Sequence, residues 1–184
     1  MNASRFLAIA CLCATLPVAA LAQTNTNATA NSYAQFAGMR ELTLGAAGAS
    51  NREMNDSFGA LDFSYGMFMS PTAEWLLRQS VDYTNPRNAD SSWNGSTRLA
   101  FDYHLATDVM TRPFLGANVG YVYGDTVHDS WTAGLEAGAK VFIKPQTFLY
   151  AMASYDWRFD RGNQIDDRFN SGRYGWSVGL GYDF

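Results

Sequence analysis

The sequence predicts an all-β protein, an eight-stranded antiparallel up-and-down transmembrane β-barrel. Three observations predict this fold. Apolar and polar residues alternate with a period of two through most of the chain, which is the period of a strand with two different faces. The chain is 47% hydrophobic and 15% aromatic, yet its mean hydropathy is −0.18, so the apolar residues are interleaved with polar ones. Short and long connections also alternate along the chain, as they do in outer-membrane barrels.

Residues 1–22 are predicted to be a cleaved secretory signal peptide. Arg5 precedes an apolar stretch, and Ala20 and Ala22 provide the small residues of an A-x-A cleavage site. Both cysteines of the chain lie in this segment, so the mature protein is expected to have no disulfide or thiolate chemistry. A lipoprotein acylated at Cys11 is the alternative, but the apolar run before that cysteine is shorter than a signal peptide normally has.

Residues 23–37 are polar and rich in asparagine and threonine, which predicts a disordered periplasmic N-terminal segment. No apolar run beyond this point approaches the length that a transmembrane helix needs, so a membrane crossing would have to use strands. The outer-membrane β-barrel is therefore assigned to residues 38–184.

Eight segments of the barrel region follow the period of two. In the first half the alternating positions are Leu42, Leu44, Ala46, Gly48; Leu61, Phe63, Tyr65, Met67, Met69; Trp75, Leu77, Gln79, Val81, Tyr83; and Leu99, Phe101, Tyr103, Leu105. In the second half they are Leu115, Ala117, Val119, Tyr121, Tyr123; Trp131, Ala133, Leu135, Ala137, Ala139, Val141, Ile143; Leu149, Ala151, Ala153, Tyr155, Trp157, Phe159; and Tyr174, Trp176, Val178, Leu180, Tyr182, Phe184. Strands of these lengths cross a bilayer when they are tilted.

The intervening positions of the last seven segments carry the charges. We predict that they form an interior charge network of Asp62, Arg78, Asp82, Arg98, Asp102, Glu136, Lys140, Asp156, Arg158, Arg173 and Asp183. Unpaired charges are unfavourable in a narrow lumen, so this nearly balanced set is expected to pair with itself, with a gated ion path as the alternative. His104 shares the inward positions and is expected to be a hydrogen-bonded interior histidine. The glycines at inward positions are expected to make room for the charged side chains.

The connections fix the predicted topology. Those at 70–73, 107–111 and 144–147 are short and turn-like, whereas those at 50–57, 85–96, 125–130 and 160–171 are longer and polar. An even number of strands then places both termini on the periplasmic side, with the longer loops outside.

Large aromatic residues near the ends of the segments predict two interfacial girdles. The girdle residues are Trp75, Tyr83, Tyr123, Trp131, Trp157 and Phe159, together with Tyr182 and Phe184 at the C-terminus. Trp93 is expected to be an exception in the longest polar loop, where it would contact a partner, lipopolysaccharide sugars or a neighbouring loop.

Two stretches resemble a known class of proteins. "RPFLGANVGYVYGD" at 112–125 resembles the Pro-aromatic-x-Gly strand of the small eight-stranded outer-membrane barrels, the OmpA-barrel, OmpX and opacity-protein class. The terminal "SVGLGYDF" resembles their C-terminal signal, here formed by Ser177, Gly179, Tyr182 and Phe184. The resemblance implies delivery by periplasmic chaperones and insertion by the barrel-assembly machinery, which would recognise Phe184 and its neighbours as an insertion signal.

The remaining function classes are narrowed by what the sequence lacks. The net charge of −4 and the absence of a basic run argue against binding to nucleic acid. His128, Asp129 and Ser130 are adjacent, so alternation points them apart, and they do not form a catalytic triad. No cofactor and no metal site are expected. We predict a non-enzymatic, monomeric protein of the bacterial outer membrane, with a structural or surface-interaction role and outer-membrane lipid and lipopolysaccharide as partners. The alternatives are a narrow channel for small solutes and, behind it, a lipid A-modifying enzyme.

Overall fold

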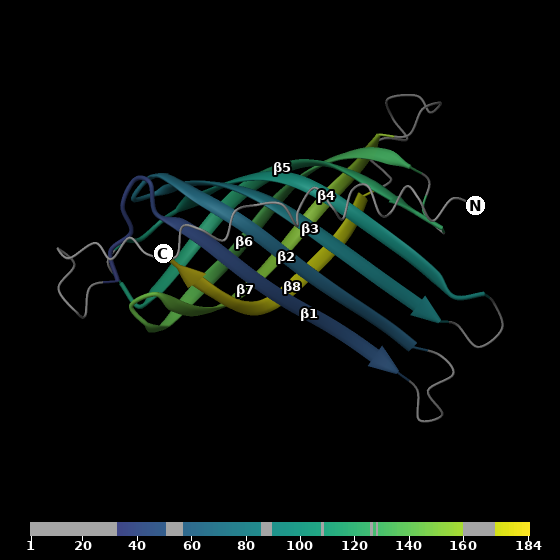
Figure 1. Cartoon of the computed structure of the whole chain (residues 1–184). Helices are drawn as coiled ribbons and strands as arrows, with labels where there is room; N and C mark the ends of the chain where they lie inside the picture. Colours follow the sequence, from purple (N-terminus) through teal and green to yellow (C-terminus); the bar gives the residue numbers. More distant parts are fainter. Residues whose placement is uncertain are drawn as a thin grey trace.

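The described part of the chain is a closed β-barrel. A computed structural model describes residues 33–50, 57–85, 90–107, 109–125, 127, 129–159 and 172–184. Eight antiparallel strands follow one another around the barrel in chain order (Figure 1). They are β1 (Arg40–Ser50), β2 (Ser57–Ser70), β3 (Ala73–Asn85), β4 (Ser92–His104), β5 (Thr111–Gly124), β6 (Ser130–Lys144), β7 (Thr147–Phe159) and β8 (Gly172–Asp183). The predicted all-β, eight-stranded, up-and-down fold is confirmed.

The two ends of the barrel differ in their connections. At the end that we call the turn end, β2–β3, β4–β5 and β6–β7 are joined by short turns, and the C-terminus lies there too (Figure 1). The opposite end, the loop end, carries the other four connections. The predicted loops 50–57 and 160–171 fall almost entirely outside the described residues.

The predicted loop 85–96 is too long at its C-terminal side. β4 begins at Ser92, and Trp93 pairs with Tyr83 across the β3–β4 ladder. Trp93 is therefore a strand residue, and its ring lies 4.7 Å from the Tyr83 ring, centroid to centroid. The polar residues around Trp93 hid the alternation, because a strand near the end of a barrel does not need an apolar residue at every outward position.

The two faces of the barrel wall have opposite chemistry. Large apolar side chains stand on the outside of every strand, and Leu61, Leu135 and Trp131 are each about 60% exposed. Apart from Arg40 and Lys144 at the turn end, the charged residues of the described strands occupy inward positions. The core of this protein is therefore a lumen of polar and aromatic side chains, and its exposed surface is apolar.

Inward glycines lie beneath the large interior side chains. A Cβ on Gly116 would collide with Asp102 and Glu136, and a Cβ on Gly138 would collide with the Phe114 ring. The absence of a side chain on one strand thus makes room for a large one on its neighbour, as the sequence predicts for a barrel of this width.

Candidate functional site in the barrel interior

The lumen has two parts with different packing. Toward the turn end it is filled by charged and aromatic side chains that are almost fully buried. We call this group the plug; its members are Glu41, Phe68, Glu74, Asp102, His104, Arg112, Phe114, Lys140, Phe142, Phe148 and Asp183. Toward the loop end it contains a cavity of about 320 Å³ that is lined by hydroxyl and charged groups. Glu41, Phe114 and Lys140 border the cavity at its floor, where it meets the plug.

Lys140 is at the centre of the plug. Its Nζ donates to Glu41 Oε2 at 2.5 Å and to Glu74 Oε2 at 2.8 Å, which ties β6 across the lumen to β1 and β3. His104 Nε2 lies 3.1 Å from the same Glu74 oxygen. The exposed fraction of all four side chains is 3% or less, so the ammonium group is compensated by protein groups rather than by water.

Aromatic rings complete the surroundings of this ammonium group. Lys140 Nζ lies 5.5 Å from the ring centroid of Phe68, 5.8 Å from that of Phe114 and 5.2 Å from that of Phe148. Ring faces are electronegative and attract a cation at such distances. Two carboxylates and three rings from five strands therefore converge on one charge.

Arg78 connects the plug to the cavity. Its Nη2 lies 2.7 Å from Asp102 Oδ2 and 2.9 Å from Glu136 Oε1, so one guanidinium joins β3 to β4 and β6. Asn118 Nδ2 donates to Glu136 and to Asp156, each at 3.1 Å. These contacts run across the lumen, and they obstruct the barrel at this level.

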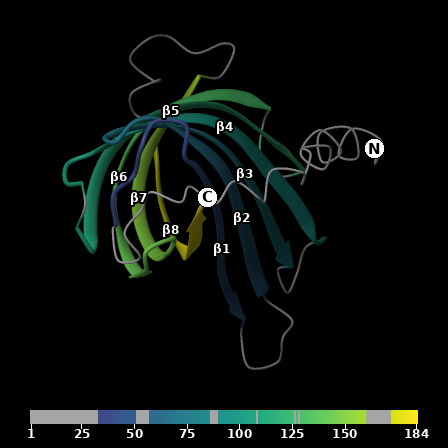
Figure 2. The same cartoon turned by 60° about the vertical axis from the view of Figure 1, so that its left-hand side comes forward.

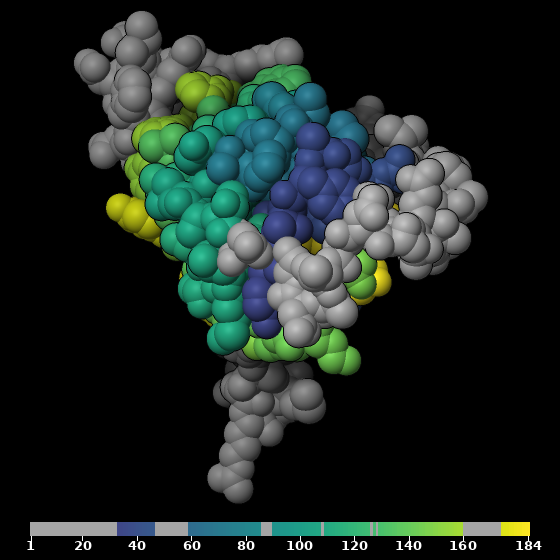
Figure 3. All heavy atoms as spheres, turned by 90° about the vertical axis from the view of Figure 1, so that its left-hand side faces the viewer, coloured from purple at the N-terminus to yellow at the C-terminus, as the bar shows by residue number. Residues whose placement is uncertain are grey.

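The segment before β1 caps the turn end. Gln35 is 3% exposed, and its Nε2 donates to Asp183 Oδ2 at 2.9 Å. The ring of Tyr33 meets the ring of Phe142 edge-on at 6.0 Å between centroids, and the guanidinium carbon of Arg112 lies over the Phe142 ring, 4.8 Å from its centroid. Seen from this end, the purple residues that begin the described chain lie across the middle of the face (Figure 3). Residues 33–37 of the segment predicted to be disordered are thus packed against the barrel, and residues 23–32 lie outside the described part.

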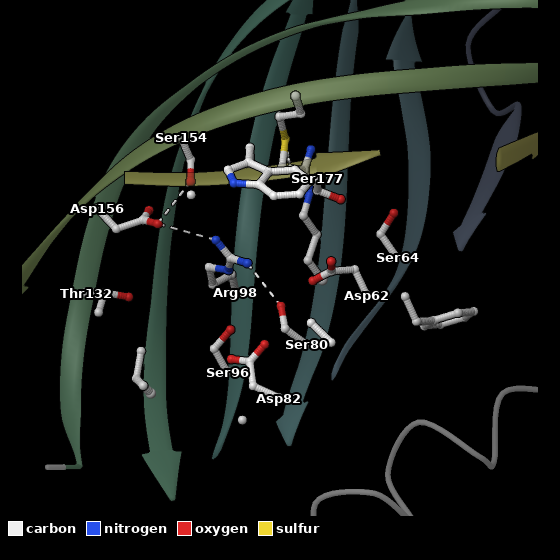
Figure 4. Close-up of a pocket in the computed structure, with 18 of the residues that line it drawn as sticks. Asp62, Ser64, Ser80, Asp82, Ser96, Arg98, Thr132, Ser154, Asp156 and Ser177 are labelled. Carbon is white, nitrogen blue, oxygen red and sulfur yellow. Dashed lines mark hydrogen bonds and ion pairs between the residues drawn. The ribbon is translucent and has the colours of Figure 1, made fainter. Parts of the chain in front are cut away.

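Arg98 is the central charge of the cavity. Its Nη1 lies 3.4 Å from Asp156 Oδ2, and its Nη2 donates to Ser80 Oγ at 3.0 Å (Figure 4). Ser154 Oγ donates to the same Asp156 oxygen at 3.1 Å. The cavity wall is rich in hydroxyl-bearing side chains, which include Thr43, Ser64, Ser80, Thr84, Ser96, Thr132, Tyr150, Ser154 and Ser177. Both signs of charge and many hydroxyls therefore face the space inside the loop end.

The predicted interior residues divide between these two parts. Arg78, Asp102, Glu136, Lys140 and Asp183 lie in or next to the plug. The residues that line the cavity are Asp62, Asp82, Arg98, Asp156 and Arg158. Arg173 lies on β8 opposite Asp156 in the ladder, and its side chain lies outside the described part.

Sequence reasoning missed three plug residues, Glu41, Glu74 and Arg112. Each of them occupies an inward position at the turn end of its strand and is fully buried. The sets of alternating residues begin at Trp75 and Leu115, so they leave out the residues immediately before them. Extending the alternation toward the turn by one residue would have found Glu74, and extending it by three residues would have found Arg112.

The predicted insertion-signal residues lie along β8. Ser177 is inward and buried, Gly179 pairs with Gly45 of β1, and Tyr182 is outward with its hydroxyl 3.3 Å from Gln146 Oε1. The backbone N–H of Phe184 donates to the Arg40 carbonyl oxygen at 2.8 Å, and the Arg40 N–H donates back at 2.9 Å. These residues help to close the barrel, and their recognition by an assembly machinery stays a prediction.

The predicted girdle residues all stand on outward positions, and Trp75, Trp131 and Trp157 each pair with another aromatic ring. Trp75 meets Phe101 at 5.1 Å, Trp131 meets Tyr121 at 5.4 Å and Trp157 meets Tyr155 at 5.0 Å between ring centroids. Tyr123, Tyr83 and Phe159 lie near the loop ends of their strands. These outward aromatic side chains lie where the predicted girdles would be. Their contact with a membrane interface stays a prediction.

The residues weighed as an enzyme or metal site are not assembled into one in the described part. His128 lies outside the described residues, and Ser130 starts β6 as a buried residue. Among the residues that the structure describes, no group of three His, Cys, Asp or Glu side chains is placed to hold a metal ion. The same part of the chain contains no helix that is long and apolar enough to cross a membrane.

The fold matches several solved barrels. The N-terminal β-barrel domain of Pseudomonas aeruginosa OprF matches with a TM-score of 0.57 and 18% identity, over 82% of this chain and all 100% of that chain. Neisserial surface protein A, NspA, matches with a TM-score of 0.57 and 15% identity, over 79% and 96% of the two chains. The outer membrane protein OprG from Pseudomonas aeruginosa matches with a TM-score of 0.57 and 11% identity, over 83% and 98%.

No model of a known protein family matches the sequence, and no curated protein matches it significantly. The structural similarities therefore establish the fold, which is that of the small eight-stranded outer-membrane barrels.

Proposed function

We propose that the chain is an integral β-barrel protein of the bacterial outer membrane with a structural or surface-interaction role and no enzymatic activity. The observation that carries this proposal is the outer face of the barrel, which exposes large apolar side chains on every strand. Monomeric soluble proteins rarely expose a contiguous apolar patch of more than a few hundred Å². Strand pairing around the barrel also satisfies the backbone groups internally, as the interior of a bilayer requires, except along the loop-end halves of β1 and β8. Two of the three solved barrels described above are a surface protein and an outer membrane protein by name, which supports the same location.

We assign the proposed interaction role to the outer wall and the loop end of the barrel, because side chains obstruct the lumen. Lys140, Glu41 and Glu74 connect opposite strands within the plug, and the surrounding aromatic side chains are buried. The surfaces that remain for interaction are the apolar wall, which would contact lipid and lipopolysaccharide, and the loop end with its polar cavity. Export through a cleaved signal peptide and insertion by the assembly machinery are part of this proposal.

Replacing Leu135 with arginine tests the location. Leu135 is outward, 57% exposed and near the middle of β6, so in a bilayer the charge would lie near the midplane. We expect Leu135→Arg to lower the free energy of unfolding by about 2–4 kcal/mol in phospholipid vesicles. The measurement is urea unfolding followed by tryptophan fluorescence and by the change in gel mobility on boiling.

The matched control is Leu105→Arg, because Leu105 is equally outward and exposed but lies next to the turn end of β4. Near the interface we expect a cost of about 0–1 kcal/mol. If both variants stay within about 0.5 kcal/mol of the parent protein, as exposed positions of a water-soluble barrel would, the membrane location is wrong.

The channel hypothesis gives a separate prediction. Because the plug crosses the lumen, we expect no stable unitary conductance from the full chain in planar bilayers. Stable conductance steps that disappear when Arg98 or Asp102 is neutralised would favour the narrow channel instead.

The enzyme hypothesis is tested by mass spectrometry of lipid A. We expect the lipid A spectra to stay unchanged after overexpression of the protein, and a new lipid A species would favour the enzyme.

A further inference from the structure

The closure between β1 and β8 is much shorter than the other strand contacts. The two strands pair only from Glu41↔Asp183 to Gly45↔Gly179 among the described residues. β7 and β8, in contrast, pair from Thr147↔Tyr182 to Trp157↔Gly172. The loop-end halves of β1 and β8 therefore face one another without a ladder, and they diverge in that direction (Figures 1 and 2).

The polar cavity opens sideways through this gap. The cavity is bordered by the inward side chain of Ser177 and also by Trp176 and Tyr174, which stand on the outer face of the same strand. Both faces of β8 can border one cavity because, among the described residues, this half of the strand has no ladder partner on its β1 side. Tyr174 is 82% exposed and Trp176 is 71% exposed, more than any other large apolar side chain in the described part.

An apolar groove on the outer wall leads to the same gap. Leu44, Ala46, Leu61, Leu149, Val178 and Leu180 line this groove around the last pair of the closure, Gly45↔Gly179. Tyr150 borders the groove and the polar cavity alike. Its ring and hydroxyl lie over the two glycines, in the space that side chains on them would occupy. The groove and the cavity therefore lie on opposite faces of the wall at the closing pair, next to the point where the β1–β8 ladder ends.

We infer that the groove, the gap and the cavity together bind a single-chain amphiphile with a hydroxylated headgroup, which enters sideways from the outer leaflet of the membrane. The chain lies in the groove, and the headgroup passes between β1 and β8 into the cavity. The inference rests on the proposed membrane location.

The chemistry at the gap favours a hydroxylated headgroup. The Tyr150 hydroxyl lies 3.1 Å from Ser177 Oγ, and Thr43 and Ser64 form a second hydroxyl pair on the same cavity wall. Beyond Gly45↔Gly179, the facing edges of β1 and β8 present backbone N–H donors and C=O acceptors that no strand pairs. Leaving these groups without a hydrogen-bond partner in hydrocarbon would be unfavourable. Hydroxyl groups both donate and accept, so they match the edges and the wall together.

A disulfide across the gap tests the inference. If the β1–β8 register continued, Ala49 would face Gly175, so Ala49→Cys/Gly175→Cys should close the gap when oxidised and release it when reduced. Both natural cysteines lie in the predicted signal peptide, so the mature chain offers no competing thiol. The probe is an alkyl glucoside with a diazirine on its sugar, used in phosphatidylcholine vesicles, with labelled residues mapped by mass spectrometry.

We expect the reduced protein to be labelled at Tyr150 and Ser177, and the oxidised protein to lose this labelling while outward residues such as Leu135 stay labelled. Interior labelling that is absent in both states, or equal in both, would overturn the inference. A disulfide between two chains would also overturn it, because the open edges would then pair two copies of the barrel.

A second pair of variants covers the case in which the disulfide does not form. Ala46→Trp fills the groove from the outer face, and Ala137→Trp places the same side chain on an outward alanine of β6, away from the gap. We expect interior labelling to be lost in Ala46→Trp and kept in Ala137→Trp, and equal labelling in both contradicts the inference. A failure of the membrane location would be seen separately, as a neutral effect of Leu135→Arg.

Discussion

Replacing Lys140 with methionine is expected to destabilise the folded barrel by about 3–5 kcal/mol, because it leaves the carboxylates that the lysine compensates buried and without their cation. Lys140 is 3% exposed, and its two partners Glu41 and Glu74 are 0% exposed. Methionine keeps the length of the side chain and its contact with the surrounding rings, so the change mainly removes the charge. The measurement is the free energy of unfolding in urea, with the protein in phospholipid vesicles.

Two controls separate the charge from the packing. In Lys140→Met/Glu41→Gln/Glu74→Gln the buried charges are removed together, so most of the lost stability should return. Arg98→Met breaks an ion pair in the open cavity, where both side chains are 16% exposed, and should cost about 0–1 kcal/mol. If Lys140→Met is no more harmful than Arg98→Met, the plug does not depend on its central cation.

The strands were predictable because a barrel wall has two environments and a strand alternates between them. Leu135 and Glu136 on β6 show this directly, since the first is 57% exposed outside and the second is 4% exposed inside. Alternation identifies a strand only while large apolar residues mark its outward positions. Around Trp93 the marking is interrupted by Gly95 and Thr97, and β4 therefore begins earlier than the sequence predicts.

Which interior side chains contact one another was harder to predict than which residues face the lumen. Lys140 and Glu41 are 99 residues apart in sequence, and their contact depends on the shear of the whole barrel, which brings β6 opposite β1. Alternation assigns each residue to the interior, but it does not say at which height the residue lies. The separation into a packed plug and an open cavity follows from those heights, so it is visible only in the structure.

The incomplete closure had a weak signal in the sequence. β1 carries Gly45, Ala46, Ala47, Gly48 and Ala49 in succession, a longer run of glycine and alanine than any other strand has. The alternation in the sequence predicts both strands, which the structure pairs at Leu42↔Tyr182 near the turn end. It could not show that the ladder stops at Gly45, because the end of a ladder depends on strand divergence rather than on residue type.

The closing pair Gly45↔Gly179 is the position where a small added side chain should have a large effect. A Cβ on Gly179 would collide with the Leu44 carbonyl oxygen and with the Gly45 Cα, which are backbone atoms of the neighbouring strand, and with the Tyr150 ring. A ring can rotate away, but the backbone of β1 can yield only by moving off β8. Because the β1–β8 ladder is short, a shift at this pair endangers the closure as a whole.

We therefore expect Gly179→Val to lower the free energy of unfolding by about 3 kcal/mol, at the upper end of the usual effect of overpacking. We also expect fewer chains to refold to the folded barrel, which is recognised by its change in gel mobility on boiling. The matched control is Gly59→Val on β2, where an added Cβ would meet nothing within 4 Å. That variant should stay within about 0.5 kcal/mol of the parent protein. Equal effects of the two substitutions would mean that the short ladder does not limit closure. A selective loss in Gly179→Val would show that the barrel is held shut by a few residue pairs at the turn end, which is the condition under which the rest of the gap can open to the membrane.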